Sequence, residues 1–424
     1  MTPTKPHEEE EHKLTHTSTI TLNKIQEKEK EEHKLTQTST ITLNKPQEEE
    51  EHKLTHTSTL TPNKAQEEEE KEQHKVALKD EVEKLRQCLP KATFMGTKFE
   101  ALKYQGFWCA LGSNRVLEQI LTFQRHFQAK DTDLIIASLP KTGTTWLKSL
   151  LYSVVNRVDF KPTQSPLLTH NPHELVYHLE ISVYGEHLAY PNHHQLDELP
   201  SPRLLHTHLP YDSLPESIRS SKSKILYIGR NPMDTFVSHW HFFPKMMKNM
   251  SINEDFKLPS IEEYFEEFCQ GKILCGPFFE HVLGYWKQSL ELPNKVLFLK
   301  YEDLKDDPIV HLKKLAEFVG VPFTPQEEND GVVKEIIELC SINNLKELEV
   351  NKSGIMNKVI DNKTFFRKGE VGDWTNYFNS TMEERMKNLM KNYLDDVGLS
   401  FKLGTNSCSH PLLNENNLQQ ECTI

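Results

Sequence analysis

The chain has 424 residues, a formal net charge of −12 and 26% charged residues. This length allows two or three domains, and the acidic balance argues against nucleic acid as a partner. No run of 18 apolar residues occurs, and the charged first ten residues do not resemble a secretory signal, so we expect no membrane span and no signal peptide.

The cysteine pattern favours a reducing compartment. Seven cysteines are scattered and lack the paired spacing of a metal site, which predicts reduced thiols in a cytosolic protein. They are Cys88, Cys109, Cys269, Cys275, Cys340, Cys408 and Cys422.

The N-terminal region is a charged tandem repeat. Residues 1–80 hold 18 acidic and 12 lysine side chains, and the segment 12–24 recurs at 33–45 and 52–64. Its few apolar residues cannot form a core, so we predict that residues 1–74 are a disordered low-complexity tail. The alternative is a partner-binding array whose threonine-rich runs pair as strands.

The folded part is predicted to span 75–402, followed by a tail at 403–424. Helical spacing of apolar residues predicts helices over 76–89 and 117–127. The aromatic segment 104–109 between them is either core or one wall of an apolar pocket.

A phosphate-binding loop is predicted after the first buried strand. The apolar run 134–137 reads as a strand, Pro140 to Gly143 as a tight turn, and Thr144 opens a helix. Loop amides, the helix N-terminus and Lys141 would converge on one anion. The spacing differs from the usual triphosphate loop because Lys141 precedes Gly143, and an ordinary structural turn is the alternative.

Three more strands are predicted at 203–208, 224–229 and 295–301, and a turn at 302–304 is expected after the last of them. The alternation of strands and helices predicts an α/β fold, a single P-loop-like domain with a central parallel sheet flanked by helices. The Pro-rich stretch 160–200 is predicted to be loop. Further helices are expected at 259–270, 278–290, 309–318, 325–339 and 381–396.

Two histidines alternate on the second strand. His206 and His208 would lie on one face, which invites a metal interpretation. We set it aside because no third ligand of suitable spacing follows them.

Four separated segments carry groups suited to a ligand with two phosphates. Arg230 lies at a strand's carboxyl end, where open α/β sheets bind ligands, and Trp146 could stack on an adenine. No Walker-B-like Asp follows the strands, which disfavours a Mg²⁺-triphosphate enzyme. The segments are Lys141 to Trp146, Arg230 with Ser238, Tyr301, and Arg367-Lys368-Gly369.

Residues 95–402 resemble a plant cytosolic sulfotransferase. The matching motifs are Pro140-Lys-Thr-Gly-Thr-Thr-Trp146, Thr207-His-Leu-Pro210, Arg230-Asn-Pro-Met-Asp234 with Ser238, Tyr301-Glu-Asp303, and Phe366-Arg-Lys-Gly369 followed by Gly372-Asp-Trp374.

The resemblance implies sulfuryl transfer from 3′-phosphoadenylyl sulfate to an acceptor hydroxyl, without a metal. His208 would be the catalytic base, and Lys141 would neutralise charge on the bridging oxygen. The 5′-phosphosulfate and adenine would contact Lys141, Thr142, Gly143, Thr144, Thr145 and Trp146. The 3′-phosphate would contact Arg230, Ser238, Arg367, Lys368 and Gly369, and Tyr301 would complete the donor site.

The chain departs from the family pattern at three places. His206 stands where many animal members carry lysine, so a second cation there depends on protonation. The dimerisation signature is unmatched near Thr375 and Asn379, which predicts a monomer. Ile342 replaces an animal phenylalanine in the adenine-side loop 340–345.

The acceptor is left open by the sequence. Aromatic residues at 104–108 and 240–243 predict a pocket for a small, flat or lipophilic hydroxylated molecule, such as a flavonoid, steroid, hydroxyjasmonate or desulfoglucosinolate. The alternatives for the whole protein are a nucleotide-dependent kinase and a non-catalytic nucleotide-binding scaffold for the repeat tail.

Overall fold

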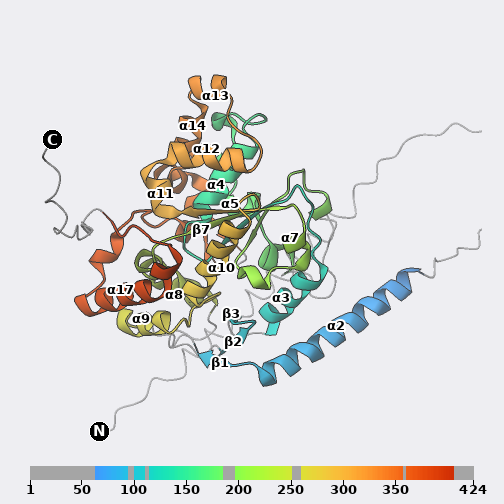
Figure 1. The fold of residues 1–424 in the computed structure, drawn as a ribbon. Coiled ribbons are helices and arrows are strands. Elements are labelled where there is room, and N and C mark those ends of the chain that lie inside the picture. Colours follow the sequence, from blue (N-terminus) through green and yellow to red (C-terminus); the bar gives the residue numbers. More distant parts are fainter. Residues whose placement is uncertain are drawn as a thin grey trace, which may run out of the picture. The chain divides into compact units, whose positions relative to one another are not determined.

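A five-stranded parallel sheet, whose strand order differs from the sequence order, forms the centre of the structure with helices on both sides (Figure 1). The order is β5 (Tyr177–His178), β6 (Leu204–Thr207), β4 (Leu134–Ser138), β7 (Lys224–Gly229) and β8 (Val296–Lys300). All neighbouring pairs are parallel. The predicted α/β class with a central parallel sheet is therefore confirmed.

The computed structural model describes residues 63–93, 100–109, 114–184, 196–250, 259–356 and 360–404. The tandem repeats of residues 1–62 and the segment 405–424 lie outside these ranges, as do Cys408 and Cys422. The domain limits expected at residues 74 and 402 thus stay predictions, although the first described helix already begins at Asn63.

The strands bury side chains on both faces, which explains their nearly continuous apolar sequence. On β4, Ile135 and Ala137 face one core and Leu134 and Ile136 the other. The first core is covered by α3 (Asn114–His126), α8 (Pro232–Met250), α10 (Phe278–Glu291) and α17 (Ser380–Leu394). The second is covered by α4 (Thr144–Val155), α12 (Pro308–Phe318) and α14 (Val332–Leu339). Figure 1 shows these two groups of helices on opposite sides of β7.

Two small antiparallel sheets and several short helices complete the described fold. The first small sheet has β1 (Lys91–Thr93), β2 (Glu100–Tyr104) and β3 (Phe107–Cys109), and the second has β9 (Ile355–Met356) and β10 (Ile360–Asp361). The remaining α-helices are α2 (Asn63–Cys88), α5 (Pro172–Leu175), α7 (Glu216–Ser220), α9 (Ile261–Cys269), α11 (Tyr301–Asp306), α13 (Pro325–Asn329), α15 (Ile342–Glu347) and α16 (Glu349–Lys352).

The structure corrects three sequence-based predictions. The stretch 160–200 is not loop throughout, because it contains α5 and the edge strand β5. The turn expected after Tyr301 is the helix α11. The helix predicted over 325–339 is split into α13 and α14 at Gly331, whose φ of 83° lies outside the helical region.

The alternative left open for segment 104–109 is decided in favour of the core. Phe107 and Trp108 are 1% and 7% exposed and belong to the core that contacts α3. The cysteines of the described ranges are free thiols, in agreement with the predicted reduced state; they are Cys88, Cys109, Cys269, Cys275 and Cys340. Over the same ranges, every helix is too short or too polar to cross a membrane.

Candidate active site

The loop between β4 and α4 is shaped by two residues with positive φ. Lys141 has a φ of 71° and Gly143 one of 120°. A Cβ at Gly143 would lie 2.8 Å from both Ile228 Cδ1 and Tyr301 Cδ2, so the loop requires glycine there. Gly143 is also the N-cap of α4 and provides no side-chain acceptor. The first amides of the helix are therefore free to bind an anion.

The three threonines of this loop have different surroundings. Thr142 is fully buried, and its hydroxyl donates to two backbone carbonyls at 2.8 Å, so it holds the loop closed. The hydroxyl of Thr144 lies 2.7 Å from Ser138 Oγ, and that of Thr145 lies 2.9 Å from His173 Nε2. Thr144 and Thr145 line the cavity, whereas Thr142 is not among the described residues that do so.

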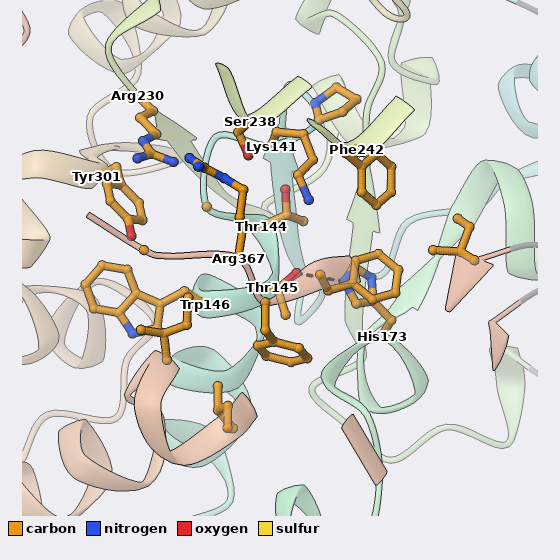
Figure 2. A pocket seen from close by; sticks show the side chains of 18 of the residues that line it. Lys141, Thr144, Thr145, Trp146, His173, Arg230, Ser238, Phe242, Tyr301 and Arg367 are labelled. Atoms are coloured by element: carbon orange, nitrogen blue, oxygen red, sulfur yellow. Dashed lines mark hydrogen bonds between the residues drawn. The ribbon is translucent and has the colours of Figure 1, made fainter. Parts of the chain in front are cut away.

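Two guanidinium groups from distant segments reach the same cavity (Figure 2). Arg230 follows β7, is 5% exposed, lies 3.5 Å from Asp234, and places its guanidinium carbon 4.4 Å from the ring centroid of Tyr301. The Nε atoms of Arg230 and Arg367 are buried and have no acceptor in the described structure. Buried donors without acceptors are uncommon, and an anionic ligand would satisfy them.

Lys141 is the third cation of the cavity. Its Nζ lies 3.9 Å from the ring centroid of Phe242, and Figure 2 shows these two side chains together. Burial, followed by repulsion from Arg367, Arg230 and Lys245, lowers the pKa of Lys141 to about 7. The cavity thus concentrates positive charge, which favours a ligand with several negative charges.

The side of the cavity expected to hold adenine contains aromatic and aliphatic groups. Trp146 and Tyr301 meet edge to face with ring centroids 5.3 Å apart. Ser238 on α8 and Ile342 at the start of α15 also line the cavity. The adenine-side segment 340–345 therefore lies at the cavity wall, but it is not the expected loop, because the helix α15 begins at Ile342.

The segment 367–369 contributes unequally. Arg367 and Lys368 both pair with Asp373, at 2.5 and 2.6 Å. The Lys368 side chain is 42% exposed and is not one of the described cavity-lining residues. Gly369 does line the cavity, and a Cβ there would lie 2.7 Å from Ile342 Cδ1, so the absence of a side chain permits close packing.

His208 directly follows β6 and lies beside the loop between β4 and α4 that carries Lys141. Its Nδ1 donates to the carbonyl of Ser138 at 2.6 Å; since a carbonyl can only accept, this bond fixes the proton on Nδ1. The lone pair of Nε2 is then free to accept a proton. Burial, opposed by the bond to Ser138, lowers the pKa of His208 to about 3, so the ring is neutral near pH 7.

A buried carboxylate positions the His208 backbone. Glu180 Oε1 accepts from Thr207 Oγ1 at 2.6 Å and from the His208 amide at 2.9 Å. Burial raises the pKa of Glu180 to about 7. No sequence motif marks this residue, because it lies in the Pro-rich stretch 160–200.

A family model described as a sulfotransferase domain matches residues 131–398. The chain belongs to the sulfotransferase family. It is 44% identical to cytosolic sulfotransferase 15 of Arabidopsis thaliana over 78% of this chain and 90% of that relative. It is 43% identical to flavonol 3-sulfotransferase of Flaveria bidentis over 76% of this chain and 100% of that relative. The predicted resemblance to plant cytosolic sulfotransferases is thus confirmed.

Solved sulfotransferase structures agree with this assignment. An Arabidopsis thaliana sulphotransferase is 37% identical with a TM-score of 0.56, covering 74% of this chain and 93% of that one. A mouse sulfotransferase complexed with PAP is 27% identical with a TM-score of 0.53, covering 70% and 96%. The protein is therefore an enzyme that transfers a sulfuryl group to a small acceptor.

Several cavity residues of this sulfotransferase had no signal in its sequence. His173 stacks on Phe365 with ring centroids 4.2 Å apart, and its Nδ1 lies 3.2 Å from Lys148 Nζ. Phe242 contacts Lys141, whereas only the general aromatic character of 240–243 had suggested a pocket. These side chains come from separate elements, so no local motif could connect them.

The structure places a third histidine beside His206 and His208, so the lack of a third ligand no longer argues against a metal there. No third ligand follows them in the sequence, but His178, which precedes them, lies beside both. The ring centroids of His178 are 4.5 Å from His206 and 4.9 Å from His208. Burial lowers the pKa of His206 well below its usual value, so this residue does not supply a second cation near pH 7.

Proposed function

We propose that this sulfotransferase moves the sulfuryl group of 3′-phosphoadenylyl sulfate to a hydroxyl of a small phenolic or lipophilic acceptor, with His208 as general base. The observation that carries the proposal is the hydrogen bond from His208 Nδ1 to Ser138, which leaves Nε2 as a proton acceptor. His208 lines the same cavity as Lys141 and the first residues of α4.

The donor is 3′-phosphoadenylyl sulfate, and the loop before α4 is suited to its 5′-phosphosulfate. The amides at the start of α4 and the ammonium of Lys141 provide hydrogen bonds and charge on one side. Arg230, Ser238 and Arg367 supply the groups for the 3′-phosphate, and Trp146 supplies an aromatic face for adenine. In this proposal Thr142 acts through its backbone and by closing the loop with its hydroxyl, and Lys368 acts through its ion pair with Asp373.

The reaction needs one proton transfer and one displacement. The acceptor hydroxyl gives its proton to His208 Nε2 while its oxygen bonds to sulfur. The bond between sulfur and the bridging oxygen breaks, and its electron pair stays on the 5′-phosphate of adenosine 3′,5′-bisphosphate. Lys141 stabilises the charge that develops on this oxygen. Every atom and charge is accounted for by donor, acceptor and His208.

The acceptor side of the cavity is apolar. The cavity has a volume of about 330 Å³, and a group of aliphatic and aromatic side chains lines part of it beyond the donor groups. These residues are Ile181, Phe242, Phe243, Met246, Leu274 and Met356. A flat, lipophilic molecule with one hydroxyl near His208 fits such a lining. The flavonol 3-sulfotransferase among the relatives makes flavonols the first acceptors to test. A cytosolic monomer is the state in which we expect the enzyme to act.

The test separates chemistry from donor binding. A panel of phenolic and alicyclic alcohols is incubated with the full-length protein and donor labelled on its sulfur. His208→Ala should lower the rate of transfer at least about 100-fold. The Kd for adenosine 3′,5′-bisphosphate should stay within about twofold of the wild-type value. His170→Ala, at an exposed histidine, is the matched control and should retain both. Equal loss of binding and transfer in His208→Ala would refute its assignment as the base.

A further inference from the structure

We propose that His178, His206 and His208 form a binding site for a divalent cation of the zinc class. A cation bound there inhibits the enzyme, because it occupies the nitrogen of His208 that would accept the proton. This inference goes beyond the proposed function, because sulfuryl transfer as derived above uses no metal.

The sheet brings the three imidazoles together. His178 on β5 is paired directly with His206 on β6, and His208 follows two residues later. The ring centroids of His206 and His208 are 4.3 Å apart, and one nitrogen from each of the three rings lies within 4.8 Å of the others. Ligand nitrogens around a tetrahedral zinc are about 3.4 Å apart, so modest side-chain rotations would close the site.

Two buried polar atoms, one in this cluster and one beside it, have no hydrogen-bond partner among the described residues. His206 is 0% exposed, and its Nδ1 lacks a hydrogen bond to any described residue. Glu180 Oε2 is likewise buried without a hydrogen bond in the described ranges, and it lies 3.5 Å from His178 Nε2. Buried polar atoms are normally satisfied. A cation held by the imidazoles would satisfy His206, and the carboxylate would offset the cation's charge or orient His178.

The ligand set selects a class of metal. Three imidazoles with a carboxylate beside them suit Zn²⁺, Co²⁺, Ni²⁺ or Cu²⁺ and disfavour Mg²⁺ and Ca²⁺, which prefer oxygen ligands. Besides burial, the charge of Lys148 acts on all three histidines and lowers their pKa values, but its ammonium donates to the Val176 carbonyl at 2.9 Å and lies beside His173. Its ammonium is thus hydrogen-bonded outside the histidine cluster.

The position of the histidines in the cavity explains how a cation could reach them and how it would inhibit transfer. His178 and His208 both line the cavity, so a cation that enters it reaches two of the three imidazoles. The bond to Ser138 commits His208 Nδ1, so Nε2 is the atom that would bind the metal. A metal-bound Nε2 cannot accept the acceptor's proton. Inhibition should therefore affect transfer and leave binding of adenosine 3′,5′-bisphosphate intact.

The test measures the metal directly, independent of turnover. Full-length protein freed of metal with EDTA is titrated with Co²⁺, followed by visible absorption, and with Zn²⁺ in competition with a chromophoric chelator. We expect one ion per chain and a tetrahedral Co²⁺ spectrum. His178→Asn should weaken Zn²⁺ binding by at least about 30-fold, since one ligand is lost. His170→Ala should leave binding unchanged.

Inhibition by Zn²⁺ in the wild type and in the histidine variants supports or overturns the proposal. Zn²⁺ should inhibit the wild-type enzyme, and inhibition measured against each variant's own metal-free rate should be lost in His178→Asn. His206→Asn, checked for folding by circular dichroism, should also lose Zn²⁺ binding and inhibition. If this variant does not fold, the result for His178→Asn, at a partly buried side chain, decides the proposal. Absence of a bound ion, or equal affinity in His178→Asn and the wild type, would overturn the proposal. Neither result would affect the assignment of sulfuryl transfer.

Discussion

The low pKa of Lys141 should make donor-site binding depend on pH. Burial and the cations Arg367, Arg230 and Lys245 lower this pKa from 10.5 to about 7. A ligand with two phosphates reverses the local charge and raises the pKa again. Above pH 7, binding of adenosine 3′,5′-bisphosphate therefore requires uptake of a proton by Lys141. The neighbouring His239, with a pKa of about 3, stays neutral.

The magnitude follows from this pKa. Since a free-enzyme pKa of about 7 leaves about a tenth of the Lys141 ammonium at pH 8 and a hundredth at pH 9, the Kd should rise about 50-fold between pH 7 and 9. The affinity for adenosine 3′,5′-bisphosphate should fall with rising pH: it is highest below the free-enzyme pKa of Lys141 and is lost as the pH rises through this value. Proton uptake on binding at pH 8 should be about 0.9 per site.

Calorimetry in two buffers of different ionisation enthalpy measures both the affinity and the proton uptake. Lys141→Arg should bind with a Kd that is nearly constant between pH 7 and 9, because the guanidinium does not titrate there. Lys148→Met is the matched control: burial also lowers the pKa of Lys148 to about 7, but its ammonium faces His173 and Val176. This variant should keep the wild-type slope. A flat profile in the wild type, or an unchanged slope in Lys141→Arg, would refute the reasoning.

Three further predictions concern the loop, the core and the repeats. Gly143→Ala should weaken binding of adenosine 3′,5′-bisphosphate by at least about tenfold, measured by calorimetry, because its Cβ would lie 2.8 Å from Tyr301 in a backbone region that favours glycine. Asp133→Ala should lower the free energy of unfolding by about 3–5 kcal/mol in urea titrations, since it leaves Arg203, 3% exposed and bonded at 2.6 Å, as an unpaired buried charge; a loss below about 1 kcal/mol would contradict this. Deletion of residues 1–62 should leave kcat and KM for the best acceptor within about twofold, whereas activity confined to the full-length chain would assign the repeats a role in catalysis.

The strands and the donor loop could be predicted because their signals are local. The run 134–137 is buried on both faces of the sheet, so its apolar sequence alone indicates a central strand. The residues from Lys141 to Trp146 are contiguous, so one motif carries the phosphate-binding geometry. Arg230 was placed at the cavity because it directly follows a strand whose carboxyl end lies at the same edge as β4.

The missed features depend on tertiary contacts. β5 has two residues and is held by pairing with β6, so no apolar run marks it. His178 and Glu180 belong to this segment, and their proximity to His208 therefore had no sequence signal. The roles expected for Thr142 and Lys368 stay predictions, because a motif identifies residues without showing which of their atoms face a ligand.

The most direct test of the account compares adenosine 3′,5′-bisphosphate with adenosine 5′-monophosphate by calorimetry on the full-length protein at pH 7. If Arg230, Ser238 and Arg367 hold a second phosphate, the bisphosphate should bind at least about 100-fold more tightly. Arg230→Ala should remove most of this difference. Equal affinities for the two nucleotides, or tighter binding of ATP with Mg²⁺ than of the bisphosphate, would contradict the central claim that separated segments form a site for a doubly phosphorylated adenosine.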